Sequence, residues 1–255
     1  MISTAVEPMP APPLRAFTIL CKWRYLQLGK ELPQLLLAQV VIATGTGVGL
    51  GFLVSDVDQR AGSYIATGAF LLNLFIISTV MVPSVISEQK HTGALDYMWS
   101  LPAPRLAHPL AELVVWSSAA LPGMLVSLLV MSFRFDLDLR FGPLLVPTVV
   151  LTVLTATAVG TAIGLRSKSQ QATNLLTNAL LMLVLLFSPV NFPGDRLPGW
   201  LQAIHEVLPI AAMADMVRGG LLVGYEADLA RDLVTLGAWC AVALTLTIRS
   251  VNRTV

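Results

Sequence analysis

Long apolar runs alternate with short polar segments along almost the whole chain. A helix needs about 20 mostly apolar residues to cross the hydrocarbon core of a membrane, and six runs reach or nearly reach that length. These runs are Leu32–Val54, Ala61–Val85, Leu113–Ser132, Leu144–Leu165, Thr173–Val190 and Leu233–Ile248. The pattern therefore predicts an all-α membrane protein with six transmembrane helices.

The composition supports a chain that lies in the lipid bilayer. Of its 255 residues, 55% are hydrophobic and 12% are charged, whereas a soluble domain has about 25% charged residues. The two cysteines, Cys21 and Cys240, lie far apart, one before the first run and one inside the last. We therefore expect neither a disulfide nor a cysteine metal site.

Two segments outside the six runs are also predicted to be helical. Leu14–Lys30 mixes aromatic and aliphatic residues with four basic ones, which predicts an amphipathic helix in the inner membrane interface. A juxtamembrane helix that only anchors the first span is equally compatible. Between the fifth and sixth runs, Pro193, Pro198 and Pro209 break the chain into short helices. We expect these helices to cap the outer face, with a partly re-entrant path as an alternative.

The basic residues predict the orientation of the spans. With the N-terminus inside, the cytoplasmic segments contain ten of the sixteen Lys and Arg residues, as the positive-inside rule requires. Both termini are therefore expected in the cytoplasm. The predicted parts are a cytoplasmic N-terminus with the interfacial helix at 1–31, a transmembrane domain at 32–248 and a cytoplasmic tail at 249–255.

Catalytic and ion-coupling chemistry is not evident in the predicted spans. The three histidines, His91, His108 and His205, fall outside the runs, and no zinc-protease or serine-hydrolase motif is present. No charged residue lies in the interior of a run, and Glu112 stands at the mouth of the third. Because ion-coupled transporters usually keep an ionisable group near the midplane, energy for any uphill transport must come from elsewhere. The glycine-rich Gly45–Gly51 lacks the spacing of a nucleotide-binding loop and suits close helix packing.

The loop Ser87–Arg105 is the most polar and turn-rich segment between two spans. Its core, Asp96 to Trp99, is predicted to form a short helix that presents acidic and aromatic side chains. Gly93 permits a sharp turn before the helix, and Pro102 ends it. A loop with an interfacial aromatic belt is the alternative; Trp, Tyr and Met are also enriched at protein interfaces.

The order of residues in this loop resembles the signature of ABC-2 type transporter permeases. In that signature a glutamate precedes Gly-Thr-Leu-Glu, a Ser/Thr-Pro pair and an arginine, and the helix docks on an ATPase subunit. Ala94 and Asp96 stand here in place of the usual Thr and Glu. The outer segment with its "LPGWLQAI" and "VRGGLL" runs is also similar. The resemblance implies that ATPase coupling depends on Glu88, Gly93, Asp96, Tyr97, Pro102 and Arg105.

This resemblance implies the membrane subunit of a bacterial ABC exporter in the cytoplasmic membrane. Two copies of a separate ABC ATPase would bind ATP and magnesium, so no cofactor is expected in this chain and it is not an enzyme by itself. The permease would form a homodimer, or a heterodimer with a related permease, and would bind no nucleic acid. A non-transporting scaffold or sensor with the same fold, and a glycan or peptide exporter, are the alternatives.

Uncharged polar residues in the second and fifth spans are candidates for a substrate pathway. Either they form interhelical hydrogen bonds, or they line a largely apolar cavity. The second reading favours an amphipathic or lipophilic substrate, such as a drug or a lipid-like molecule. The candidate residues are Asn73, Ser78, Thr79, Asn174, Thr177 and Asn178.

Overall fold

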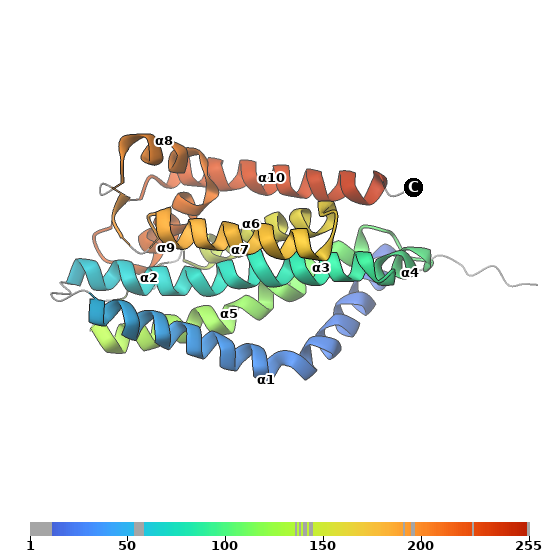
Figure 1. The fold of residues 1–255 in the computed structure, drawn as a ribbon, viewed down its shortest axis with the longest axis horizontal. Coiled ribbons are helices and arrows are strands. Elements are labelled where there is room, and N and C mark those ends of the chain that lie inside the picture. Colours follow the sequence, from blue (N-terminus) through green and yellow to red (C-terminus); the bar gives the residue numbers. More distant parts are fainter. Residues whose placement is uncertain are drawn as a thin grey trace, which may run out of the picture.

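The computed structural model is an elongated bundle whose main helices run along its long axis (Figure 1). It describes residues 12–53, 59–135, 137, 139, 142, 145–190, 192–194, 197–225 and 227–253. Within these ranges the chain is all-helical, and its only extended pairing is a single bridge between Leu139 and Leu222. The predicted all-α class is confirmed.

The helices follow one another with short connections. Their bounds are α1 Pro13–Leu53, α2 Gln59–Phe75, the π-helix η1 Ile76–Met81, α3 Val82–His91, α4 Ala94–Ser100, α5 Ala107–Phe135, α6 Leu145–Arg166, α7 Gln170–Phe187, α8 Gly199–Val207, α9 Pro209–Leu221 and α10 Leu229–Arg253.

Five segments of the described chain are long and apolar enough to cross a membrane, and each overlaps one of the last five predicted runs. The first of them passes without a break through α2, η1 and α3. The segments are Gly62–His91, Ala107–Phe135, Leu145–Arg166, Gln170–Phe187 and Leu229–Asn252. The first predicted run lies in α1, and its last residue, Val54, lies outside the described residues. The six-span layout therefore stays a prediction.

Helix α1 is one continuous helix that bends into two arms (Figure 1). Pro33 lies inside it, and a proline removes a backbone donor and clashes with the preceding turn. We attribute the bend to Pro33 and call residues 13–32 the first arm.

The predicted domain limits at 31/32 and 248/249 fall within continuous helices, α1 and α10.

The π-helix η1 brings the backbone carbonyl of Ser78 against another helix. Val82 donates its N–H to the carbonyl of Ile77, five residues earlier. In that register the next donor would be Pro83, which has no N–H, so no bond of the π-helical pattern reaches the carbonyl of Ser78. Gly160 of α6 lies directly against this Ser78 oxygen. The absence of a side chain at Gly160 thus allows α6 to pack onto the irregular turn.

The two ends of the bundle carry different elements (Figure 1). Helix α4, the start of α1 and the end of α10 lie together at one end, which we call the α4 end. Helix α8 and the start of α2 lie at the opposite end. Helix α9 lies near α8 at this opposite end and packs against α2, α6 and α10. This arrangement places both described ends of the chain at the same end of the bundle as α4.

Candidate functional site

The turn between α3 and α4 is built by two adjacent residues. Thr92 ends α3 by donating both its N–H and its hydroxyl to the carbonyl oxygen of Glu88, at 2.9 and 2.8 Å. Gly93 follows with φ of 77°, a left-handed conformation that favours glycine, and its carbonyl accepts the first α4 hydrogen bond, from Tyr97. A turn of this kind sets α4 at an angle to the helix before it.

Helix α4 has a buried face and an exposed face. Leu95 and Met98 are buried, and Trp99 packs against the same core. Asp96 and Tyr97 point away from it, and Tyr97 is 68% exposed. Asp96 lies in the first turn, where a carboxylate interacts favourably with the helix dipole. The helix is therefore anchored to the bundle while it presents an acid and a phenol outward.

The residues after α4 extend this exposed surface. Leu101 has extended backbone angles, which end the helix, and Pro102 and Arg105 are exposed. Glu88, in the last turns of α3, is exposed as well. Five of the six candidate coupling residues thus present side chains on the α4 end of the bundle, and the sixth, Gly93, contributes its backbone conformation.

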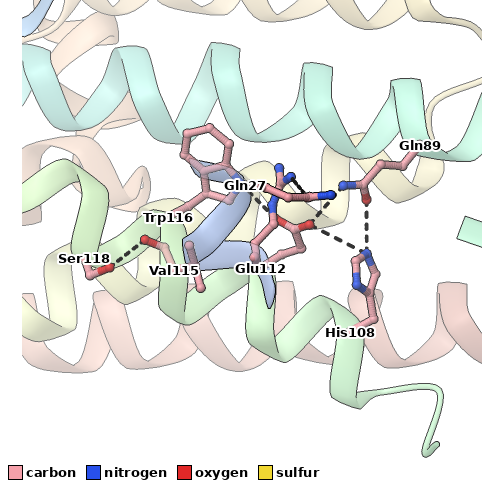
Figure 2. Close-up of polar contacts among 8 residues, drawn as sticks. Gln27, Gln89, His108, Glu112, Val115, Trp116 and Ser118 are labelled. Atoms are coloured by element: carbon pink, nitrogen blue, oxygen red, sulfur yellow. Dashed lines mark hydrogen bonds and ion pairs between the residues drawn. The ribbon is translucent and has the colours of Figure 1, made fainter. Parts of the chain in front are cut away.

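A buried carboxylate lies close to this surface. Glu112 of α5 is 1% exposed; one of its oxygens accepts hydrogen bonds from Arg24 Nε and Trp116 Nε1, both at 2.9 Å. Its other oxygen accepts from Gln89 Nε2 at 2.9 Å and lies 3.7 Å from His108 Nε2. Figure 2 shows Gln89 and His108 on one side of Glu112 and Trp116 on the other. We call these five residues the Glu112 cluster.

The Glu112 cluster joins three separate elements. Arg24 comes from the first arm of α1, Gln89 from the last turn of α3, and the remaining three residues from α5. Gln89 also bonds His108 Nε2 through its side-chain oxygen, at 3.0 Å. A buried ion pair is held firmly when further hydrogen bonds satisfy its atoms. Because Gln89 precedes α4 by only a few residues, the cluster connects the α3–α4 corner to α1 and α5.

An apolar groove of about 500 Å³ lies between α6, α7 and α10. Phe75 and Thr79 line it from the α2–η1 side, and Met213 of α9 lines it as well. Polar lining is sparse and includes Arg166 and Ser167, where α6 ends. The size is typical of small-molecule sites.

No group of three or more His, Cys, Asp or Glu suited to a metal ion occurs in the part of the chain that the structure describes.

The family model described as ABC-2 type transporter matches residues 15–222. The chain belongs to the ABC-2 type transporter family. No curated protein matches the sequence. The protein is therefore a multi-pass membrane component of an ABC transporter, and membership in this family implies an ABC ATPase partner.

The six candidate pathway residues of this ABC-2 permease differ in burial and in their contacts. Thr79 is the only one that lines the groove. Asn73 is buried within α2 and donates to the carbonyl of Ala69 at 3.3 Å. Asn178 is exposed on α7 and donates to the carbonyl of Asn174 at 2.7 Å.

The other three pathway candidates are not among the residues that line the groove. Ser78 and Thr177 are fully buried. Asn174 accepts a hydrogen bond from the hydroxyl of Ser84 on α3 at 2.9 Å, which supports the interhelical alternative for this residue.

A second buried charge of the permease lies in α9. Arg218 is 1% exposed, and its guanidinium holds α9 against α2 and the turn after α7. It contacts the backbone oxygens of Pro189 and Val190, the hydroxyl of Thr67, the carboxylate of Asp215 and the ring of Tyr64. This density of partners is what a buried guanidinium requires.

Asp215 connects this arginine to the segment before α10. Its Oδ1 lies 3.4 Å from Arg218 Nη1 and accepts a hydrogen bond from the Tyr225 hydroxyl at 2.6 Å. Burial, together with this bond, raises the pKa of the Tyr225 hydroxyl. The hydroxyl therefore stays protonated and acts as a donor.

Sequence reasoning missed the Glu112 cluster and the groove. Arg24 and Glu112 are 88 positions apart, and no periodic pattern links them. A local signal was available at one point, since His108, Glu112 and Trp116 follow one another at four-residue spacing and must share a helix face.

Proposed function

We propose that the chain is the permease subunit of an ATP-driven exporter in the bacterial cytoplasmic membrane, with both termini in the cytoplasm. Two copies of a separate ABC ATPase supply the energy, and the permease works as a homodimer or a heterodimer with a related permease. The observation that carries this proposal is the α4 surface: Asp96 and Tyr97 are exposed while Leu95 and Met98 anchor the same short helix to the core.

The α4 surface is connected to the spans in a way that suits force transmission. Helix α3 continues through η1 into α2, so a displacement of α4 acts on the whole segment Gly62–His91. Lys90 Nζ donates to the carbonyls of Leu165 and Ser167, at 3.0 and 2.9 Å, and so ties α3 to the end of α6. The Glu112 cluster ties it to α1 and α5. ATP-driven movement of α4 therefore rocks these helices together.

The chemistry of ATP belongs to the partner in this proposal. ATP and magnesium bind to the ATPase subunits, and the permease alone hydrolyses no ATP. Glu88, Gly93, Asp96, Pro102 and Arg105, with Tyr97 beside them, form the coupling surface. Acidic and aromatic groups on an exposed, anchored helix suit a partner surface with basic and apolar contacts.

The substrate proposed is an amphipathic or lipophilic molecule, either drug-like or lipid-like. The apolar lining of the groove between α6, α7 and α10 supports this class. A few polar groups in the lining, Thr79 among them, would orient such a molecule.

We expect the Asp96→Lys variant to bind the ATPase on the order of tenfold more weakly, about 1.4 kcal/mol, because the reversed charge meets a surface suited to an acid. The tagged permease is co-expressed with its ABC ATPase and purified in mild detergent. The amount of retained ATPase and its rate of ATP hydrolysis are then measured.

The Glu206→Lys variant is the matched control, since Glu206 is an exposed acid on α8, far from α4. It should retain the ATPase as the unmodified permease does. Full retention and turnover in the Asp96 variant would show that α4 is not the coupling element. If the unmodified permease retained no ATPase, the proposed function itself would fail.

The proposed orientation predicts which loops reach the cytoplasm. Single cysteines replace His91, Lys168 or Glu206 in a chain lacking Cys21 and Cys240. An impermeant thiol reagent on intact cells should label position 206 and spare positions 91 and 168, which should react only after the membrane is opened. Labelling of position 91 on intact cells would show that the orientation is the reverse of the one proposed.

A further inference from the structure

The groove between α6, α7 and α10 is open on one side of the bundle. Leu176 on α7 and Val242 on α10 both line it and are 49% and 51% exposed. In a protein that spans a membrane, side chains exposed at this level of a helix meet lipid. The groove is therefore accessible to a molecule that lies in the bilayer.

The groove covers about half the thickness of the membrane. Its α6 wall runs from Ala156 to Arg166, which is about 15 Å at the rise of an α-helix. The hydrocarbon core is about 30 Å thick. One acyl chain from a single leaflet therefore matches the length of the groove.

The end of the groove beside α4 is positively charged. Arg166 lines it, and Lys168 and Arg249 follow closely after α6 and near the end of α10. All three are exposed, and no acidic side chain in the described chain forms an ion pair with them. Lys90, by contrast, is engaged by two backbone carbonyls. Unpaired cations at the surface of a leaflet attract anionic headgroups, at about 1 kcal/mol for each.

We infer that the groove binds one acyl chain of an anionic phospholipid from the leaflet at the α4 end, with the headgroup phosphate at Arg166. The apolar walls take the chain, and Arg166, assisted by Lys168 and Arg249, selects the charge of the headgroup. This inference specifies which amphiphile the groove binds, and in that respect it rests on the proposed function. Phe75 and Thr79 also line the groove, so the bound chain contacts the π-helix η1 of the second span.

Trp239 provides a direct readout of occupancy. It lines the groove on α10, ten positions before Arg249, or about 15 Å deeper along the helix. Trp23 and Trp200 are exposed at 42% and 66% and report on surrounding lipid instead. The contribution of Trp239 is obtained by subtracting the fluorescence of a Trp239→Phe variant, which leaves the other four tryptophans in place.

The experiment measures quenching of Trp239 by phospholipids brominated in the middle of the chain. The purified permease, without ATPase, is reconstituted in phosphatidylcholine that contains a small fraction of brominated phosphatidylglycerol or brominated phosphatidylcholine. The anionic lipid should quench Trp239 at a severalfold lower mole fraction. Arg166→Gln should reduce this preference roughly fivefold, while Arg134→Gln, an exposed arginine at the opposite end, should leave it unchanged.

Each other outcome overturns the inference. Equal quenching by the two lipids, or a preference that survives Arg166→Gln, removes the headgroup site. Absence of Trp239 quenching by both lipids means that something else, such as a second copy of the chain, covers the groove. Because no ATPase is present, a negative result leaves coupling through α4 untouched, and failure of ATPase association leaves the lipid measurement valid.

Discussion

The Glu112→Ala variant should lose about 3 to 5 kcal/mol of stability, the cost of breaking a buried ion pair by removing one partner. Arg24 would remain beside α5 with its charge uncompensated, since its ion pair with Glu112 is the only one it forms among the described residues. Trp116 Nε1 and Gln89 Nε2 would lose their acceptor as well. The apparent melting temperature of the purified permease should fall by about 10 °C.

Three further variants separate the causes. Glu112→Gln keeps an acceptor oxygen and the volume, and it should melt between the alanine variant and the unmodified protein. The double variant Arg24→Ala/Glu112→Ala should lose less than the sum of the two single changes, because no charge is left unpaired. Glu206→Ala removes an exposed carboxylate at the opposite end and should have no effect. If the Glu112→Ala variant had the same apparent melting temperature as the unmodified permease, the cluster would not hold the helices together.

The Gly160→Ala variant should be the most damaging single-methyl change in a described span, at about 3 kcal/mol, the upper end of the usual cost of overpacking. The added Cβ would overlap the backbone oxygen of Ser78, and a backbone atom cannot rotate away. Helix α6 would have to separate from η1, which would also disturb Phe75 and Thr79 at the groove. Thermal unfolding and Trp239 fluorescence report these two effects.

Gly237→Ala is the control for this change. Gly237 also lies in a span, and a Cβ there would have no neighbour within 4 Å. It should be neutral or slightly stabilising, because alanine has the higher helix propensity. If both alanine variants unfolded alike, the close approach of α6 to the carbonyl of Ser78 would be refuted.

Much of the architecture could be predicted because it depends on local chemistry. The length of an apolar run decides whether a helix can cross a bilayer, and five such runs correspond to described helices that are long and apolar enough to do so. The α4 segment was also locally encoded: Gly93 supplies the left-handed turn, and the exit at Leu101 immediately precedes Pro102. The order of residues from Glu88 to Arg105 led to the family, which the match over residues 15–222 confirms.

The first arm of α1 shows where local reasoning stops. The sequence indicated an interfacial helix followed by a separate span, since basic residues end at Lys30 and the apolar run begins at Leu32. The backbone continues as a helix through this boundary and bends, because a change in polarity does not interrupt backbone hydrogen bonding. Contact with α5 then directs Arg24 inward to Glu112.

The sequence by itself determined five candidate spanning segments, the α4 turn and the family, because each depends on residues within a few turns of one another. The tertiary structure alone decided that Glu112 is buried with Arg24 and Gln89, that Gly160 meets the carbonyl of Ser78, and that the groove ends at Arg166. Glu112 lies 88 positions from Arg24 and 23 positions from Gln89 along the chain, and Gly160 and Ser78 come from separate helices. Only the packing of whole helices brings such pairs together, because burial and partner choice depend on which faces meet in space.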